Sequence, residues 1–307
     1  TRVSRNIVAN IAGRLWAALM TFAFVPVYVR LMGVESFGLV GAFASLTAVL
    51  AVVDLGLSTT LNRELARLSA KEESAATSRN LVRTLEYVYW ATGAVLGLGI
   101  AVLAPIAARY WLKSDHLPIA SVTQVVLLMG FVVVFQWPSS LYSGGLLGLQ
   151  RQVTLNVVTI GVATLRGVGA SLVLWLISPT IQAFFIWQML ASGLQTAVLG
   201  AMLWRSLERS DERPVFDLDR LRGNWHFAAG MTGISLTSVL LTQMDKILLS
   251  RLLSLTAFGY YSIAGSVGFG IASVASPVFA AVFPKMTQLT AQGDEAALAQ
   301  LYHKSCQ

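Results

Sequence analysis

The stretch "IVANIAGRLWAALMTFAFVPVYV" (residues 7–29) carries a single charged residue, Arg14. A helix needs about 20 predominantly apolar residues to cross a bilayer, so this stretch predicts a transmembrane helix. Seven further stretches meet the same criterion, which indicates an all-α, polytopic membrane protein with eight transmembrane helices. The predicted spans are Ile7–Val29, Phe37–Leu61, Tyr87–Leu112, Ile119–Leu147, Val153–Ile177, Ile181–Trp204, Phe227–Leu253 and Leu255–Phe283.

The overall composition supports a membrane protein. Of 307 residues, 55% are hydrophobic and 12% are charged, whereas soluble domains carry about 25% charge. The single cysteine, Cys306, excludes an intrachain disulfide and a cysteine-based metal site. The three histidines lack metal-ligand spacing, and no phosphate loop or dinucleotide fingerprint is present. We therefore expect no metal, no cofactor and no enzyme.

Lysine and arginine are distributed unevenly between the two ends of the predicted spans. Fifteen lie on one side and four on the other, while Arg14, Arg166 and Lys246 fall within spans. Because cytoplasmic loops carry the excess of basic residues, the basic side is predicted to be cytoplasmic and both ends of the chain to lie inside. The formal net charge of +7 then reflects membrane topology and does not indicate nucleic-acid binding.

Two hairpins share a sequence pattern. "RLMGVESFG" (residues 30–38) and "RLLSLTAFG" (residues 251–259) carry Arg, Leu, Phe and Gly at the same spacing, 221 residues apart. Six spans separate them, so both hairpins face the same side, as in two parallel repeats about an axis along the membrane normal. We expect a six-helix lobe over residues 1–204, a cytoplasmic interfacial linker over 205–226, and the first two helices of a second lobe plus a cytoplasmic segment over 227–307. The last residues do not resemble a natural end, so we expect a longer chain.

Polar residues line one face of the first span. Asn10, Arg14 and Thr21 fall within about 80° of one another at 100° per residue. Asp54 in the second predicted span lies at a similar depth. Two interpretations stay open: Arg14 pairs with Asp54, or Arg14 also faces a cavity, since its five donors need not be exhausted by one carboxylate.

The fifth and seventh spans carry the remaining intramembrane charges. Arg166 lies near the middle of its span, where a charged residue is by default a functional candidate; the alternative is a buried structural pair. Thr242 and Asp245 share a polar stripe that we expect to face protein or water. Lys246 points about 100° away from Asp245 and is predicted to reach outward to the membrane interface.

Four stretches carry a family resemblance. They are "NIVANIAGRLWAALMTFAFVPVYVRLMGVESFGLVGAFASLTAVLAVVDLGLSTTLNREL" (6–65), "GLLGLQR" (145–151), "QMDKILLSRLLSLTAFGYYSIA" (243–264) and "FPKMTQLTAQGDEAALAQLYHKS" (283–305). In this order they resemble bacterial polysaccharide (O-antigen-type) flippases of the multidrug/oligosaccharidyl-lipid/polysaccharide exporter superfamily. The resemblance implies a MATE-like architecture of two six-helix lobes around a central cavity, with the second lobe incomplete here. It also implies that Arg14 matches the family's basic cavity residues.

The resemblance further implies a function. The expected activity is the transfer of an undecaprenyl-diphosphate-linked oligosaccharide from the cytoplasmic to the periplasmic leaflet of the bacterial inner membrane. This transfer serves lipopolysaccharide O-antigen or exopolysaccharide export. Expected partners are membrane lipids, a polysaccharide polymerase and glycosyltransferases, and no nucleic acid.

The charged residues take roles within this hypothesis. We predict that Asn10, Arg14, Arg166 and Thr242 contact the substrate in the cavity. Asp54, Asp245 and Lys246 would orient it or couple transport to H⁺ or Na⁺.

Two other function classes stay open. One is a cation-coupled multidrug antiporter of the same fold, which would favour acidic cavity residues, whereas three of five charges within the spans are basic. The other is a membrane glycosyltransferase or polymerase, which would need a catalytic carboxylate on an extracytoplasmic loop. Only Glu35 and Asp115 are available there, so this class ranks last.

Overall fold

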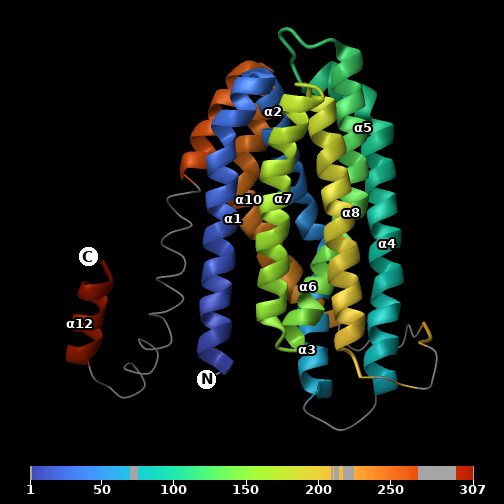
Figure 1. Ribbon diagram of the computed structural model, residues 1–307, viewed down its shortest axis with the longest axis vertical. Coiled ribbons are helices and arrows are strands. Elements are labelled where there is room, and N and C mark those ends of the chain that lie inside the picture. Colours follow the sequence, from blue (N-terminus) through green and yellow to red (C-terminus); the bar gives the residue numbers. More distant parts are fainter. Residues whose placement is uncertain are drawn as a thin grey trace.

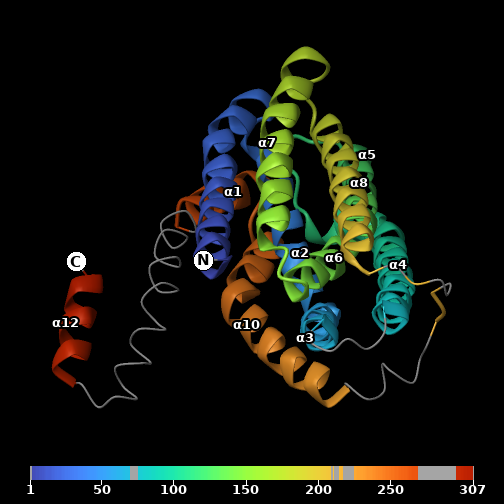
Figure 2. The same ribbon diagram turned by 60° about the horizontal axis from the view of Figure 1, so that its bottom comes forward.

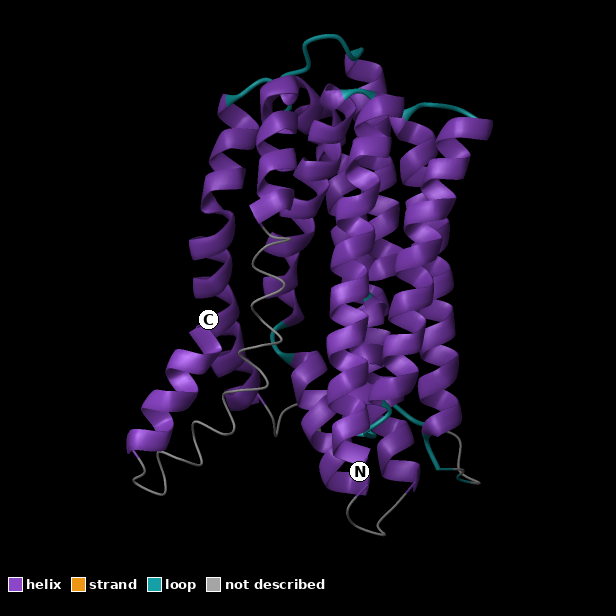
Figure 3. Cartoon of the chain, turned by 60° about the vertical axis from the view of Figure 1, so that its left-hand side comes forward, coloured by secondary structure: helices purple, strands orange, loops and turns teal. Residues whose placement is uncertain are grey.

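The computed structural model describes residues 2–69, 75–208, 210, 214–216, 225–268 and 295–306. Within these residues the regular structure is helical (Figure 3), apart from one isolated bridge between Lys113 and Ser254. The prediction of an all-α protein is therefore confirmed. Most of the helices run side by side in one elongated bundle, and the C-terminal helix α12 lies apart from it (Figure 1).

The helices begin and end as follows. They are α1 (Arg2–Met32), α2 (Val34–Leu50), the 3₁₀ turn η1 (Ala51–Asp54), α3 (Leu57–Ser69), α4 (Ala75–Ile106), the π-helical turn η2 (Ala107–Trp111), α5 (Ile119–Gln136), α6 (Pro138–Gly148), α7 (Gln152–Leu176), α8 (Ile181–Ser206), α10 (Trp225–Leu252) and α12 (Glu295–Cys306). Residues 255–268 are also helical. We refer to α1–α8 as the N-terminal helices, and to α10 with residues 255–268 as the C-terminal helices.

Six stretches of the described chain are long and apolar enough to cross a membrane. They are Leu15–Met32, Val34–Asp54, Ala75–Trp111, Ile119–Gly148, Gln152–Leu176 and Ile181–Ser206. They correspond to the first six predicted spans, and the protein is a multi-pass membrane protein. Helix α10 covers the predicted seventh span, and the eighth is described only as far as residue 268, so the count of eight stays a prediction.

The outer surface of the bundle is apolar, as a lipid-facing surface must be. On α4 the side chains of Val95, Leu98 and Val102 are 65–69% exposed, although these residue types are normally buried in water-soluble proteins. Inside the bundle, α1 packs along α7, α5 packs against both α4 and α8, and α10 packs along α2, η1 and α3 (Figure 2).

The predicted second span, Phe37–Leu61, is not one continuous helix. It ends in η1, and the chain then turns through Leu55 (φ 51°) and Gly56 (φ 69°), both in the left-handed region. Two successive left-handed residues cannot continue a right-handed helix. Helix α3 starts immediately afterwards, so Leu57–Leu61 belong to a separate helix.

The predicted fourth span, Ile119–Leu147, bends at Trp137–Pro138, where α5 ends and α6 begins. The proline ring removes one backbone donor and forces this bend. Helix α6 then packs closely against α3 because Gly144 and Gly148 lie over the backbone carbonyls of Ser58 and Asn62.

Candidate functional cavity

A cavity of about 720 Å³ lies between the N-terminal and the C-terminal helices. Its walls come from α1, α2, α5, α7 and α8 on one side and from α10 and residues 255–268 on the other. This volume is within the range of small-molecule binding sites, about 300–1,000 Å³. The cavity is therefore large enough to hold a polar headgroup or a few sugar rings.

The polar lining of the cavity is cationic and rich in amides. Arg166 of α7 and Lys246 of α10 are the charged residues in it, and among the described residues no carboxylate lines it. The neutral polar lining residues are Gln136, Gln188, Gln195, Gln243, Thr21, Ser45, Thr47, Thr159, Tyr28, Tyr261, Ser262 and Ser266. The cavity thus presents two positive charges and many neutral hydrogen-bonding groups.

Arg166 is held by neutral partners. Its Nη2 donates to the Ser192 hydroxyl at 2.8 Å and to the Gln195 side-chain oxygen at 3.0 Å. Within the described part of the chain no carboxylate forms an ion pair with it. Neutral acceptors orient a guanidinium but leave its charge uncompensated. Of the two sequence interpretations of Arg166, this geometry favours the cavity residue over the buried structural pair.

The helix that carries Arg166 is clamped on two sides. Trp187 of α8 donates to the carbonyl of Leu165 at 3.2 Å, and Tyr28 of α1 donates to the carbonyl of Gly167 at 3.3 Å. The rings of Phe24 and Trp187 lie over Gly167 and Gly169, where a larger residue would collide with them. Arg166 therefore projects from a backbone whose position is set by both neighbouring helices.

Lys246 faces the cavity, so the prediction that it reaches outward to the interface is wrong. Its Nζ donates to the Gln243 side-chain oxygen at 3.4 Å, and both residues line the cavity. They lie on one face of α10, three residues apart, and this is the face that α10 turns inward.

Thr242 lies beside Lys246 on α10 and Asp245 lies further round the helix, away from Gln243. Both are exposed, and neither lines the cavity. Asp245 accepts a hydrogen bond from Tyr261, and Thr242 donates to the carbonyl of Ser238 at 2.8 Å. Asp245 therefore reaches the cavity only indirectly, through the lining residue Tyr261.

The chain is similar to known proteins over most of its length. Residues 3–290 match the family described as "Polysaccharide biosynthesis protein". The chain belongs to this family. It is 24% identical over 294 residues to the "Succinoglycan biosynthesis transport protein ExoT" of Rhizobium meliloti (strain 1021). The aligned region covers 94% of this chain and 54% of that protein. The chain thus spans about half the length of the curated relative it matches, and no solved structure matches it.

In this member of the polysaccharide biosynthesis family, Asp54 lies outside the cavity lining. Its carboxylate accepts hydrogen bonds from the buried Tyr89 hydroxyl, from Ser58 Oγ at 2.8 Å and from Ser140 Oγ at 3.4 Å. The side chains of Asn10 and Arg14 lie outside the described residues. Their contacts, including the Arg14–Asp54 pair, therefore stay predictions.

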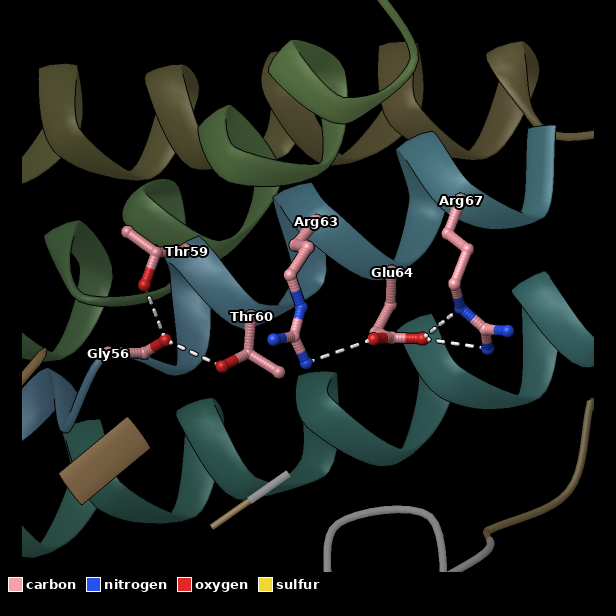
Figure 4. A network of polar contacts seen from close by, with 6 residues as sticks. All are labelled: Gly56, Thr59, Thr60, Arg63, Glu64 and Arg67. Carbon is pink, nitrogen blue, oxygen red and sulfur yellow. Dashed lines mark hydrogen bonds and ion pairs between the residues drawn. The ribbon is translucent and has the colours of Figure 1, made fainter. Parts of the chain in front are cut away.

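The described ion pairs of this family member lie away from the cavity. On α3, Glu64 binds Arg63 at 3.1 Å and Arg67 at 2.9 Å, beside a turn in which the Gly56 carbonyl accepts from Thr59 and Thr60 (Figure 4). A second acidic residue, Glu86, is held by three donors: Arg83 at 2.8 Å, Tyr142 at 2.6 Å and Trp204 at 3.2 Å. Glu64 is therefore satisfied within α3, whereas Glu86 joins α4 to α6 and α8.

Sequence reasoning missed the glutamines of the cavity. Gln136, Gln188, Gln195 and Gln243 all lie within predicted spans, and a polar amide inside a span is a signal of an inward-facing position because lipid cannot satisfy it. The hydropathy pattern concealed this signal, since a single amide barely changes the average over 20 residues.

Proposed function

We propose that the protein is a flippase that moves an undecaprenyl-diphosphate-linked oligosaccharide across the bacterial inner membrane, from the cytoplasmic to the periplasmic leaflet. Membership of the polysaccharide biosynthesis family and the similarity to a succinoglycan transport protein support a role in polysaccharide export. The observation that carries the proposal is the cavity that holds Arg166 and Lys246 and no described carboxylate.

The charge of the cavity suits a diphosphate. Bare charges are expensive in hydrocarbon, about 2.5–3.5 kcal/mol each on the insertion scale, so an anionic headgroup needs cations along its path. At about 4 Å and an effective dielectric constant near 20, each cation–phosphate pair contributes about 4 kcal/mol. The guanidinium of Arg166 adds forked hydrogen bonds, which match phosphate oxygens.

The amides of the cavity suit sugars. A glutamine side chain both donates and accepts hydrogen bonds, as a sugar hydroxyl does. Gln136, Gln188 and Gln195 on the N-terminal helices face Gln243 on α10 across the same cavity. The polyprenyl chain would stay in the surrounding lipid while the headgroup passes through the polar interior.

The lining disfavours the multidrug antiporter. A cationic drug requires carboxylates or aromatic faces free of competing cations, whereas both charged lining residues of the described cavity are positive.

In the proposed cycle Asp54 or Asp245 couples transport to H⁺ or Na⁺, with both ends of this chain on the cytoplasmic side.

The test neutralises the two cavity cations in the full-length protein expressed in a strain that lacks it. Arg166→Gln and Lys246→Gln should each reduce surface polysaccharide at least about 10-fold, since a lost charge contact of this strength costs more than 1.4 kcal/mol. Lipid-linked oligosaccharide should accumulate in the cytoplasmic leaflet. Arg166→Lys keeps the charge and should retain part of the export.

The matched control is Arg151→Gln, an exposed arginine at the start of the same helix α7. It should export normally. Normal export by both cavity variants, at normal amounts of protein in the membrane, would refute the proposed function.

A further inference from the structure

The two hairpins that share the sequence repeat pack directly against each other. A methyl group built on Gly38 would overlap the carbonyl oxygen of Leu255, and one built on Gly259 would overlap the carbonyl oxygen of Val34. The backbones therefore approach so closely that only glycine fits at either position. Such close approach through small residues is how helices pack where no hydrophobic effect drives them together.

This contact is reciprocal in the repeat. At the offset of 221 residues, Val34 corresponds to Leu255 and Gly38 corresponds to Gly259. The overlap of Gly38 with Leu255 therefore becomes the overlap of Gly259 with Val34 when the two hairpins are exchanged. A third pair, Gly41 and Ser262, is related by the same offset, and a methyl group on Gly41 would overlap the Ser262 side chain. Equivalent residues meet in this way only at a two-fold contact, like that between the subunits of a symmetric dimer.

The reciprocal contact forms one end of the cavity. Phe37 and Gly41 on α2 and Ser262 on the facing helix all line the cavity. Phe37 and its repeat equivalent Phe258 are buried at the contact. The distribution of lysine and arginine predicts that this end is extracytoplasmic, so the hairpins close the cavity on the side where the proposed substrate would leave.

A single loop supports both hairpins. On α2, Glu35 accepts hydrogen bonds from the backbone N–H groups of Asp115 at 2.7 Å and His116 at 3.0 Å. On the other hairpin, the N–H of Leu255 donates to the carbonyl of Lys113 at 2.7 Å. Among the described residues no ion pair joins the hairpins to each other. When the glycine contact separates, no ion pair between the described hairpin residues has to break, and the loop is what still ties the hairpins together.

We propose that this reciprocal glycine contact is the closed state of an extracytoplasmic gate, and that Gly38 and Gly259 are the residues that let it close. The inference rests on the proposed function, because it treats the cavity as the path of the substrate. A side chain at either position holds the hairpins apart, and a covalent link across the contact holds them together.

The first experiment measures access to the cavity from outside. In the full-length protein with Cys306→Ser, an Ala44→Cys substitution places a thiol in the cavity lining. A membrane-impermeant maleimide is then added to intact cells. Gly38→Ala should raise the initial labelling rate roughly 5- to 100-fold, the shift expected when overpacking displaces a two-state contact. Gly259→Ala should act in the same direction.

The control for this experiment is Gly99→Ala on α4, where an added methyl group meets nothing within 4 Å. It should label at the original rate. Equal labelling of the Gly38→Ala, Gly259→Ala and Gly99→Ala proteins would overturn the gate.

A second experiment locks the contact shut. Gly41→Cys and Ser262→Cys place their β-carbons 2.7 Å apart at the centre of the contact, about 1 Å closer than a disulfide takes. The hairpins must shift apart by that amount, after which an oxidant should link the two thiols, measured as their loss of reaction with a maleimide polymer. The linked protein should stop exporting polysaccharide and recover when a reductant is added. Export at an unchanged rate by the linked protein would overturn the proposal.

The two experiments separate this inference from the proposed function. Labelling of Ala44→Cys needs no substrate and reports on the gate even if the cargo is not a lipid-linked oligosaccharide. Conversely, if the Arg166 and Lys246 variants export normally and refute the proposed function, the labelling result still reports whether the hairpins open.

Discussion

The role of Asp54 can be tested because coupling and structural support predict different outcomes for the same substitutions. Asp54 sits at the break between η1 and α3 and accepts hydrogen bonds from Ser58, Tyr89 and Ser140. These donors belong to α3, α4 and α6. The carboxylate therefore joins the turn that interrupts the second span to two other helices.

The magnitude follows from these contacts. Hydrogen bonds to a charged group contribute about 1.5–3 kcal/mol each, and an unsatisfied buried donor costs about 1–3 kcal/mol. The Ser140 contact is long at 3.4 Å and exposed, and the Ser58 hydroxyl can turn to water. The main loss of stability therefore comes from the Tyr89 hydroxyl, which is left without its acceptor in a residue that is only 1% exposed. We expect Asp54→Ala to lower the free energy of unfolding by about 3 kcal/mol. For a domain of 150–250 residues that is a fall in Tm of roughly 6 to 12 °C, and the shift decreases with size, so about 6 °C or less is expected for the full-length protein.

The assay combines thermal unfolding of the purified full-length protein with export in cells. Asp54→Asn keeps an acceptor for Tyr89 and should lose less than half as much Tm as Asp54→Ala. Tyr89→Phe and Asp54→Ala should be non-additive in the double variant, because they remove the same hydrogen bond. If Asp54 carries a coupling ion, Asp54→Asn should fold normally yet export little. An unchanged Tm in Asp54→Ala, or full additivity with Tyr89→Phe, would refute the structural account.

Two further predictions concern packing and loop support. Glu35→Gln removes the negative charge that accepts several backbone N–H groups, so labelling of a cavity thiol from outside should rise a few-fold; unchanged labelling would contradict the loop's role in closing the contact. Gly148→Ala would overlap the carbonyl oxygen of Asn62 and should lower the Tm by several degrees, whereas Gly161→Ala, with open space around it, should leave the Tm unchanged or slightly raised. Equal Tm values for these two variants would show that α3 and α6 do not depend on this close approach.

The membrane helices could be predicted from sequence because hydropathy acts over the length of a whole span. The six apolar stretches found in the described structure match the first six predicted spans. The break after Asp54 could not be seen this way. It depends on left-handed backbone at Leu55 and Gly56, and Leu55 is a residue that hydropathy places inside a span.

The side chains of α10 that line the cavity could not be identified from sequence, for a physical reason. Thr242 and Asp245 share a polar stripe that the sequence predicted to face protein or water, with Thr242 as a substrate contact. In the structure the cavity instead receives Gln243 and Lys246, and Asp245 is satisfied by Tyr261 on the neighbouring helix. The pairing of two helices decides which stripe faces the cavity, and a single helix's sequence does not contain that information.

The repeated hairpin is where sequence and structure inform each other most. The spacing of Arg, Leu, Phe and Gly predicted two similar units facing the same way, but it could not say that the units touch. The structure shows that the shared glycines lie at the contact itself, which gives a reason for glycine at residues 38 and 259.

A two-fold contact between repeats puts the same demand on both copies, so each repeat position must be small where the backbones cross. On this reasoning the effects of Gly38→Ala and Gly259→Ala on cavity access should be equal in direction and similar in size, because each overpacks one half of the same contact. An effect confined to one of the two glycines would mean that the hairpins move asymmetrically and that the repeat does not govern the gate.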